Sequence, residues 1–249
     1  MKGVILAGGL GTRLYPITLT INKHLLPIYD KPMIYYPIET LVKAGIKDIL
    51  VIVSGPHAGQ FLPILKNGEE FGCKITFAFQ EKPDGGIADA LALAKNFVGG
   101  DNVCVMLGDN TTDSDISEEV YEFDEMTEEE HGPCAFLFLK NVDNPSEFGI
   151  VKFDGSTIIE KIIEKPESPP SSCAVTGVYL YDSTVFTFIT KCVPSGRGQL
   201  EITDVNNLYL ERGTVGYSVL SGFWKDAGTF EALFQANKFW RNKANGENT

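Results

Sequence analysis

The chain has 249 residues, of which 43% are hydrophobic, and a formal net charge of -12. This composition supports a large core and argues against an intrinsically disordered chain. The acidic balance disfavours nucleic acid and anionic membranes as partners, because basic side chains hold phosphate backbones, but a small anion needs only a local basic site.

The cysteines and the apolar runs indicate the cellular compartment to expect for this protein. The five cysteines are widely spaced and form no Cys-x-x-Cys pair, so we expect neither a disulfide framework nor a zinc site, and a reducing cytoplasm fits. The N-terminal apolar run is short and meets glycine at once, unlike a signal peptide. No apolar run has the roughly 18 residues of a membrane span.

The first half of the chain alternates strands with helices. Apolar runs rich in β-branched residues predict strands at 2–7, 48–53, 74–79 and 103–107. Helical spacing of apolar residues predicts the intervening helices at 33–44, 60–66 and 87–97, with a kink expected at Pro37. The alternation predicts an α/β fold with a mixed, mostly parallel central sheet and helices on both faces.

The second half differs in character. Short strands separated by turn residues are predicted at 135–140, 149–153, 157–161 and 175–181, in an antiparallel or mixed arrangement. Helices are predicted at 202–211 and 229–241, and the acidic run 117–130 is interpreted as a solvated helix face. With no linker or repeat visible, we expect one domain over 1–249 with a small β-rich lobe.

A glycine loop follows the first strand. Gly8, Gly9 and Gly11 precede Thr12 and Arg13, a pattern that fits neither the P-loop nor the dinucleotide fingerprint. The loop could nevertheless bind a phosphate for the same physical reasons as those two motifs. Glycines let backbone amides approach a phosphate, and the arginine guanidinium adds several hydrogen-bond donors. A tight turn beside a surface arginine is the alternative interpretation.

Two aspartates are candidate ligands of Mg²⁺. Asp109 directly follows the strand 103–107, at the edge where open sheets bind ligands. Asp226 precedes a glycine and a helix, so it is either a second metal ligand or the helix N-cap. Carboxylates together with phosphate oxygens and water are the usual ligands of Mg²⁺.

Other charged or polar residues lie at further strand ends or turns: Lys23, Gln80, Glu164, Lys165 and Arg197. Each is a weak signal alone, because an isolated ion pair is commonly a surface pair. Together they would suit a site for two phosphorylated substrates.

Several of these segments resemble the sugar-nucleotide pyrophosphorylases, and in particular the glucose-1-phosphate thymidylyltransferases. The similar segments are 3–14, 23–37, 107–110, 164–166, 174–179 and 200–206, in the order expected of that family. The resemblance implies the Rossmann-like nucleotide-diphospho-sugar transferase fold and a cytoplasmic enzyme. It also implies the reaction of dTTP with glucose 1-phosphate to give dTDP-glucose and pyrophosphate. We further expect a homo-oligomer, without nucleic-acid or membrane partners.

The resemblance also implies roles for individual residues. The nucleotide and its phosphates would be held by Gly8, Gly9, Gly11, Thr12, Arg13 and Lys23, and the base by Gln80 and Gly85. Asp109 and Asp226 would hold Mg²⁺. The sugar phosphate would meet Lys165 and Arg197, and the sugar pocket would include Gly149, Glu164, Val175, Thr176 and Gly177. The chain would then divide into a nucleotide half at about 1–110, a sugar-phosphate half at about 111–228 and a C-terminal helix at 229–249.

Three departures from the family pattern qualify these expectations. Phe148 stands where long members carry tyrosine, and Asp89 where the family tends to have glutamine, so base preference stays open. The chain also stops before the final helices of long members, so their secondary nucleotide site is expected to be absent or incomplete. A UTP-dependent or other hexose-1-phosphate nucleotidyltransferase, and a non-catalytic nucleotide-sugar sensor, remain as alternatives.

Overall fold

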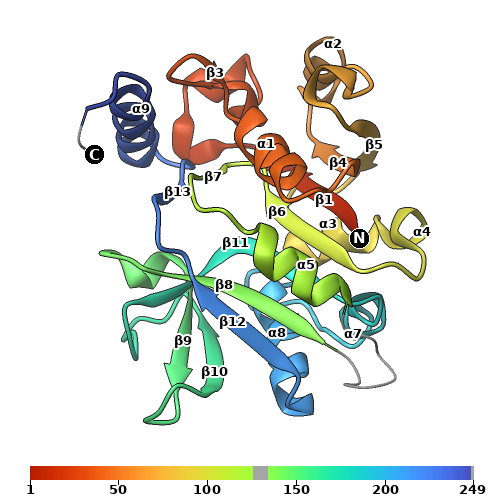
Figure 1. The fold of residues 1–249 in the computed structure, drawn as a ribbon, viewed down its shortest axis with the longest axis vertical. Helices are drawn as coiled ribbons and strands as arrows, with labels where there is room; N and C mark the ends of the chain where they lie inside the picture. Colours follow the sequence, from red (N-terminus) through yellow and green to blue (C-terminus); the bar gives the residue numbers. More distant parts are fainter. Residues whose placement is uncertain (126–133, 248–249) are drawn as a thin grey trace.

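In the computed structural model, residues 1–125 and 134–247 are described, and they build a sheet of nine strands. The central strands have the order β10-β9-β11-β6-β1-β4-β5, and β8 lies between β11 and β12 (Figure 1). The predicted run 117–130 and the predicted helix 229–249 each extend into residues outside the described parts.

The first half forms the parallel part of the sheet. The strands β1 (Lys2–Ala7), β4 (Asp48–Ser54), β5 (Lys74–Gln80) and β6 (Val103–Leu107) pair in parallel, with β1 between β4 and β6. Val4 and Ile5 have no exposed surface, as expected of a strand covered on both faces. The four strands were predicted from the sequence, and their carboxyl ends lie at one edge of the sheet.

The second half continues the same sheet through β11 (Cys173–Tyr181), which pairs antiparallel with β6. The other strands are β8 (Ala135–Asn141), β9 (Gly149–Phe153), β10 (Ile159–Glu164) and β12 (Val215–Val219). The register of β11 against β8 shifts between Val175 and Tyr179. Such an irregularity re-aims side chains, and here it falls on the predicted sugar-pocket residues.

Helices cover both faces of the sheet. The apolar sides of α3 (Ile87–Ala92), α4 (Lys95–Val98), α7 (Val185–Ile189) and α8 (Ile202–Arg212) belong to one buried cluster. Those of α1 (Tyr35–Lys43), α2 (Leu62–Leu65) and α5 (Ser117–Glu125) belong to a second cluster. The predicted two-sided α/β arrangement is therefore confirmed.

Some predicted helices and strands differ in detail from the structure. Pro37 lies in the first turn of α1, where an amide has no helical partner, so no kink is needed there. The predicted helix 60–66 is a 3₁₀ turn, Ala58–Phe61, that runs into the short α2.

The predicted helix 87–97 is two helices, because tight i to i-3 bonds at Leu93 and Ala94 interrupt it. The strand predicted at 157–161 begins at Ile159, since a turn closed by the bond from Asp154 N to Ile158 O precedes it.

Small elements complete the chain. Two short ribbons pair β2 (Pro27–Ile28) with β3 (Lys31–Pro32) and β7 (Asn110–Thr112) with β13 (Trp224–Asp226). Further 3₁₀ turns occupy Thr12–Leu14, Ile17–Leu19, Lys23–Leu25, Glu69–Phe71 and Pro145–Glu147. The long helix α9 (Phe230–Ala244) stands beside β3 at the outside of the molecule (Figure 1). None of the helices in the described residues is long and apolar enough to cross a membrane.

Candidate active site

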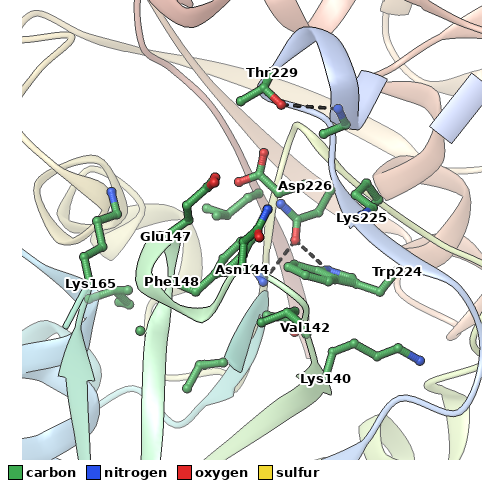
Figure 2. A pocket seen from close by; sticks show the side chains of 18 of the residues that line it. Lys140, Val142, Asn144, Glu147, Phe148, Lys165, Trp224, Lys225, Asp226 and Thr229 are labelled. Carbon is green, nitrogen blue, oxygen red and sulfur yellow. Dashed lines mark hydrogen bonds between the residues drawn. The ribbon is translucent and has the colours of Figure 1, made fainter. Parts of the chain in front are cut away.

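A cavity of about 380 Å³ lies beside the carboxyl end of β6 and between the two halves of the sheet. Its walls come from distant segments, including Arg13, Asn110, Glu164, Thr203 and Asp226. In the view of Figure 2, Lys165 lies on one side and Trp224 and Asp226 on the other, with Phe148 between them. The cavity therefore joins charged groups that lie far apart in the sequence.

The β7–β13 ribbon brings the two candidate metal ligands together. Asn110 is the pairing partner of Asp226, and Asp109 directly precedes Asn110. The backbone amide of Ala227 donates to the carbonyl oxygen of Asp109 at 2.9 Å, which fixes the two segments against each other. The two carboxylates are thus neighbours although the chain between them spans most of the second half.

The two carboxylates have opposite electrostatic environments. Asp109 is 5% exposed, and its Oδ2 forms an ion pair with Lys23 Nζ at a distance of 2.6 Å. Burial raises the pKa of Asp109, but the charge of Lys23 and the hydrogen bonds from Lys23 and Asn110 outweigh it and hold the pKa below its usual value. For Asp226, burial and then the charge of Asp109 raise the pKa to about 6. The positive charges of Lys23 and Arg13 therefore do not outweigh the effects of burial and of Asp109 on the pKa of Asp226.

This donor set fits a hard divalent cation. Two carboxylates lie close together, and burial and the charge of Asp109 raise the pKa of Asp226, a cost of ionisation that a cation would offset. The described residues contain no cluster of three or more potential His, Cys, Asp or Glu ligands. Water and phosphate oxygens would therefore complete the coordination, as is usual for Mg²⁺.

Asp226 does not cap the following helix. The side chain of Thr229 accepts the capping hydrogen bond from Ala232 N at 3.2 Å, so the N-cap interpretation of Asp226 is wrong. Asp226 Oδ1 instead accepts from Gly228 N at 2.8 Å. A Cβ at Gly228 would lie 2.6 Å from Arg13 Nη2, so glycine lets the Arg13 guanidinium approach this carboxylate.

The glycine loop lies beside a second, smaller cavity of about 90 Å³, which Gly9, Lys23 and Ser54 help to line. Ser54 ends β4, and its Oγ accepts from the amide of Gly9 at 2.8 Å. Gly11 has a φ of 64° and so occupies the left-handed region that favours glycine. The loop conformation depends on these contacts, and its role in holding phosphates stays a prediction.

Gln80 lies against Gly8 of the glycine loop, and Gly85 lies next to Asp89. A Cβ at Gly8 would approach Gln80 Oε1 to 3.0 Å, while Gln80 Nε2 donates to Asp89 Oδ2 at 2.8 Å. The segment after Gly85 is tied to the other half of the molecule, since Leu200 N donates to Gly85 O at 2.9 Å and Ala88 N donates to Leu200 O at 3.1 Å. We call this pair of bonds the Leu200 tether.

The predicted sugar-phosphate residues form an ion-pair network. Arg197 Nη2 lies 2.9 Å from both Glu164 Oε1 and Glu201 Oε1, and Thr203 Oγ1 donates to Glu164 Oε2 at 2.6 Å. These contacts position Arg197 while leaving 42% of its side chain exposed. Lys165 has a φ of 43°, an uncommon conformation for a residue with a side chain.

The irregular part of β11 supplies the next wall. The side chain of Thr176 donates to Phe138 O, and Gly177 N donates to Asn110 Oδ1 at 3.0 Å. A Cβ at Gly177 would lie 2.6 Å from Asn110 Oδ1, so only glycine permits this approach. Phe148 packs edge-on against Trp224 with ring centroids 5.6 Å apart, which makes this part of the cavity apolar.

The structure gathers part of the predicted set in the large cavity, namely Arg13, Gly149, Glu164, Lys165, Val175, Thr176, Gly177 and Asp226. The remaining predicted residues are not among its lining residues: Gly8, Gly9, Gly11, Thr12, Lys23, Gln80, Gly85, Asp109 and Arg197. Lys23 and Asp109 nevertheless bind each other beside it, and Arg197 binds the lining residue Glu164.

Sequence reasoning did not single out Ser54, Glu201 or Thr203 as functional. Ser54 was detectable, because it is a polar residue at the end of an apolar strand next to the glycine loop. Glu201 and Thr203 lie within the segment 200–206 that carries the resemblance, but no local pattern marks them as partners of Arg197 and Glu164.

Comparison with known proteins shows the family of this chain. A family model described as nucleotidyl transferase matches residues 2–243. A glucose-1-phosphate thymidylyltransferase of Neisseria meningitidis is 44% identical over 250 residues, which cover 100% of this chain and 85% of that protein. The enzyme of the same name from Mycolicibacterium smegmatis is 41% identical over 244 residues. These residues make up 97% of this chain and 82% of that protein.

Solved structures show the same relationship. One from Bacillus anthracis, provisionally assigned as a glucose-1-phosphate thymidylyltransferase and complexed with sucrose, has a TM-score of 0.89 and 47% identity over 97% of this chain and 96% of that one. A UDP-glucose pyrophosphorylase complexed with UDP-glucose shares the fold, with a TM-score of 0.82 at 23% identity over 97% of this chain and 98% of that one. This chain belongs to the nucleotidyl transferase family, in which it groups with the glucose-1-phosphate thymidylyltransferases.

Proposed function

We propose that this protein makes dTDP-glucose and pyrophosphate from dTTP and glucose 1-phosphate, with Mg²⁺ as its metal. The observation that carries the proposal is the cavity that Asp226, Glu164 and Lys165 line together. Asp109 lies beside Asp226 in the β7–β13 ribbon, and Arg197 is ion-paired with Glu164. Full-length relatives that are named for this activity support the choice of substrates.

The reaction joins two anions, and the charges at the site suit that task. A phosphate monoester carries roughly -2 at neutral pH, and each pair of like charges 4 Å apart costs about 4 kcal/mol at an effective dielectric of 20. Lys165 and Arg197 would hold the sugar phosphate, while Arg13 and Lys23 would neutralise the triphosphate. When bound between Asp109 and Asp226, Mg²⁺ would supply further charge neutralisation at the reacting phosphate.

Alignment of the two substrates would supply most of the remaining rate enhancement. Glu164, fixed by Thr203 and Arg197, would accept hydrogen bonds from sugar hydroxyls and orient the sugar phosphate for in-line attack on the α-phosphorus. The phosphate oxygen is itself the nucleophile, so the mechanism needs no nucleophilic side chain.

The direct test is a matrix of nucleoside triphosphates against sugar 1-phosphates in the presence of Mg²⁺, with pyrophosphate release as the readout. We expect the highest kcat/KM for dTTP with glucose 1-phosphate. A clear preference for UTP would establish a uridylyltransferase instead. No release above background with any pair would favour a non-catalytic sensor of nucleotide sugars.

A further inference from the structure

The Gln80 side chain has only one hydrogen-bonding direction left for a ligand. Gln80 is 4% exposed at the end of β5, and its Nε2 donates to Asp89 Oδ2 at 2.8 Å and, more weakly, to Gly86 O at 3.5 Å. A primary amide has two donor hydrogens, so both are committed to these acceptors. Among the described residues, none donates a hydrogen bond to Gln80 Oε1.

Asp89, the hydrogen-bond partner of the Gln80 amide, determines how that amide is oriented. A carboxylate only accepts hydrogen bonds, so Asp89 fixes the Gln80 amide with its nitrogen toward α3 and its carbonyl toward Gly8. An amide at position 89 would both donate and accept and would allow either orientation. Gly85 leaves room for this carboxylate, since a Cβ there would lie 2.3 Å from Asp89 Oδ2.

We propose that Asp89 is a positioning residue that makes Gln80 an obligate acceptor and thereby selects nucleobases with a ring N–H donor. The inference rests on the proposed function and on the contact between the base and Gln80 that the family resemblance implies. Thymine and uracil present N3–H to an acceptor, whereas cytosine presents a lone pair at N3 and is rejected. The proposal does not separate dTTP from UTP, because the two bases share this edge.

The expected discrimination is moderate. A buried acceptor left facing another acceptor loses its hydrogen bond, which corresponds to roughly 10- to 100-fold in kcat/KM. We therefore expect the unmodified protein to prefer dTTP to dCTP by at least this factor. Methylation of thymine N3 removes the donor, so N3-methyl-dTTP should bind as poorly as dCTP.

The test compares Asp89→Asn with the unmodified protein. Because asparagine lets the Gln80 amide turn over, the dTTP to dCTP ratio of kcat/KM should fall about 10-fold, through KM rather than kcat. Asp84→Asn removes an exposed carboxylate from the same loop and should leave the ratio unchanged. An equal loss with both nucleotides in Asp89→Asn would indicate a merely structural role and would overturn the proposal.

A double-mutant cycle separates action through Gln80 from a direct effect of the charge. In the Gln80→Ala background, Asp89→Asn should no longer change the nucleotide ratio. The same change in both backgrounds would overturn the proposal, because the carboxylate would then act on the base itself.

Calorimetric titration with dTTP, dCTP and N3-methyl-dTTP, without sugar phosphate, measures the affinity for each nucleotide. It therefore tests the role of Asp89 independently of turnover. Nucleotide binding with the expected ranking but no product would refute the proposed function and leave the role of Asp89 standing. Equal affinities for the three nucleotides, or no binding of any, would refute the role of Asp89.

Discussion

Asp109 and Asp226 show how residues of one type acquire different roles from their surroundings. The ion pair with Lys23 keeps Asp109 ionised, whereas burial and the charge of Asp109 hold the pKa of Asp226 near 6. Sequence reasoning found both residues, but only the β7–β13 register shows that they are neighbours. The charge relation between them could not be read from the sequence, because it depends on that long-range pairing.

Loss of either carboxylate should abolish most of the turnover. We expect Asp109→Asn and Asp226→Asn each to lower kcat at least about 100-fold, since each removes a ligand for the charge-stabilising metal. Asp154→Asn, which changes an exposed carboxylate in the turn before β10, serves as the matched control. Near-normal kcat in either test variant would contradict the placement of the metal.

The same two variants should change stability in opposite directions. In metal-free buffer at pH 7.5, Asp226→Asn should raise the free energy of unfolding by about 1–3 kcal/mol, because a carboxylate with a raised pKa is charged there at a cost. Asp109→Asn should lower it by about 1–3 kcal/mol, since Lys23 loses its buried partner. Urea titrations measure both, and shifts of the same sign would contradict this account.

Lys165 offers a test of backbone strain at the site. Its φ of 43° costs roughly 1–2 kcal/mol for a residue with a Cβ. We expect Lys165→Gly to be about 1 kcal/mol more stable than Lys165→Ala, with both variants raising the KM for glucose 1-phosphate. Equal stability of the two variants in urea would show that the conformation carries no strain.

At the scale of elements, the buried parallel strands were predictable and the boundaries of the short helices were not. The strand 2–7 was found because a continuous run of apolar, β-branched residues suits a strand covered on both faces. The interruption of 87–97 and the late start of β10 depend on tight turns whose hydrogen bonds have no periodic signature. Likewise, the Leu200 tether joins segments that no sequence pattern links.

The tether makes Gly86 a sensitive position. Its φ is +99°, and a Cβ there would lie 2.4 Å from Leu200 O, so an alanine would displace the loop that leads to Arg197. We expect Gly86→Ala to lower the free energy of unfolding by about 2 kcal/mol and to raise KM for both substrates. Gly100→Ala, where nothing lies within 4 Å of the added Cβ, is the control. A KM effect on only one substrate would show that the tether does not couple the two loops.

At the scale of the whole molecule, one continuous sheet joins the first and second halves of the chain, because β11 pairs directly with β6. The division of the chain near 110 and 228 stays a prediction, as does the homo-oligomer. Stability of the whole chain should depend on His24, which is 1% exposed and contacts Asn22 Oδ1 through Nδ1 at 2.8 Å. Burial and then the charge of Lys23 lower the pKa of His24 to about 3.

His24 should therefore make the protein sensitive to acid. Between pH 6.5 and 3 the unfolded chain binds this proton and the folded chain does not, so the contribution of His24 to stability falls as the pH falls, by about 1.4 kcal/mol per pH unit. In urea titrations from pH 7 to 4, His24→Gln should reduce this slope by up to that amount. A slope that His24→Gln does not alter would contradict the assignment.

The β7–β13 ribbon also has a consequence for the order of synthesis. Lys23 and Asp109 are synthesised long before Asp226, so both members of the ion pair are present in the nascent chain while Asp226 is still missing. The second carboxylate joins only when β13 pairs with β7. Until then the proposed metal site has a single carboxylate, so we expect the incomplete chain not to turn over nucleotide.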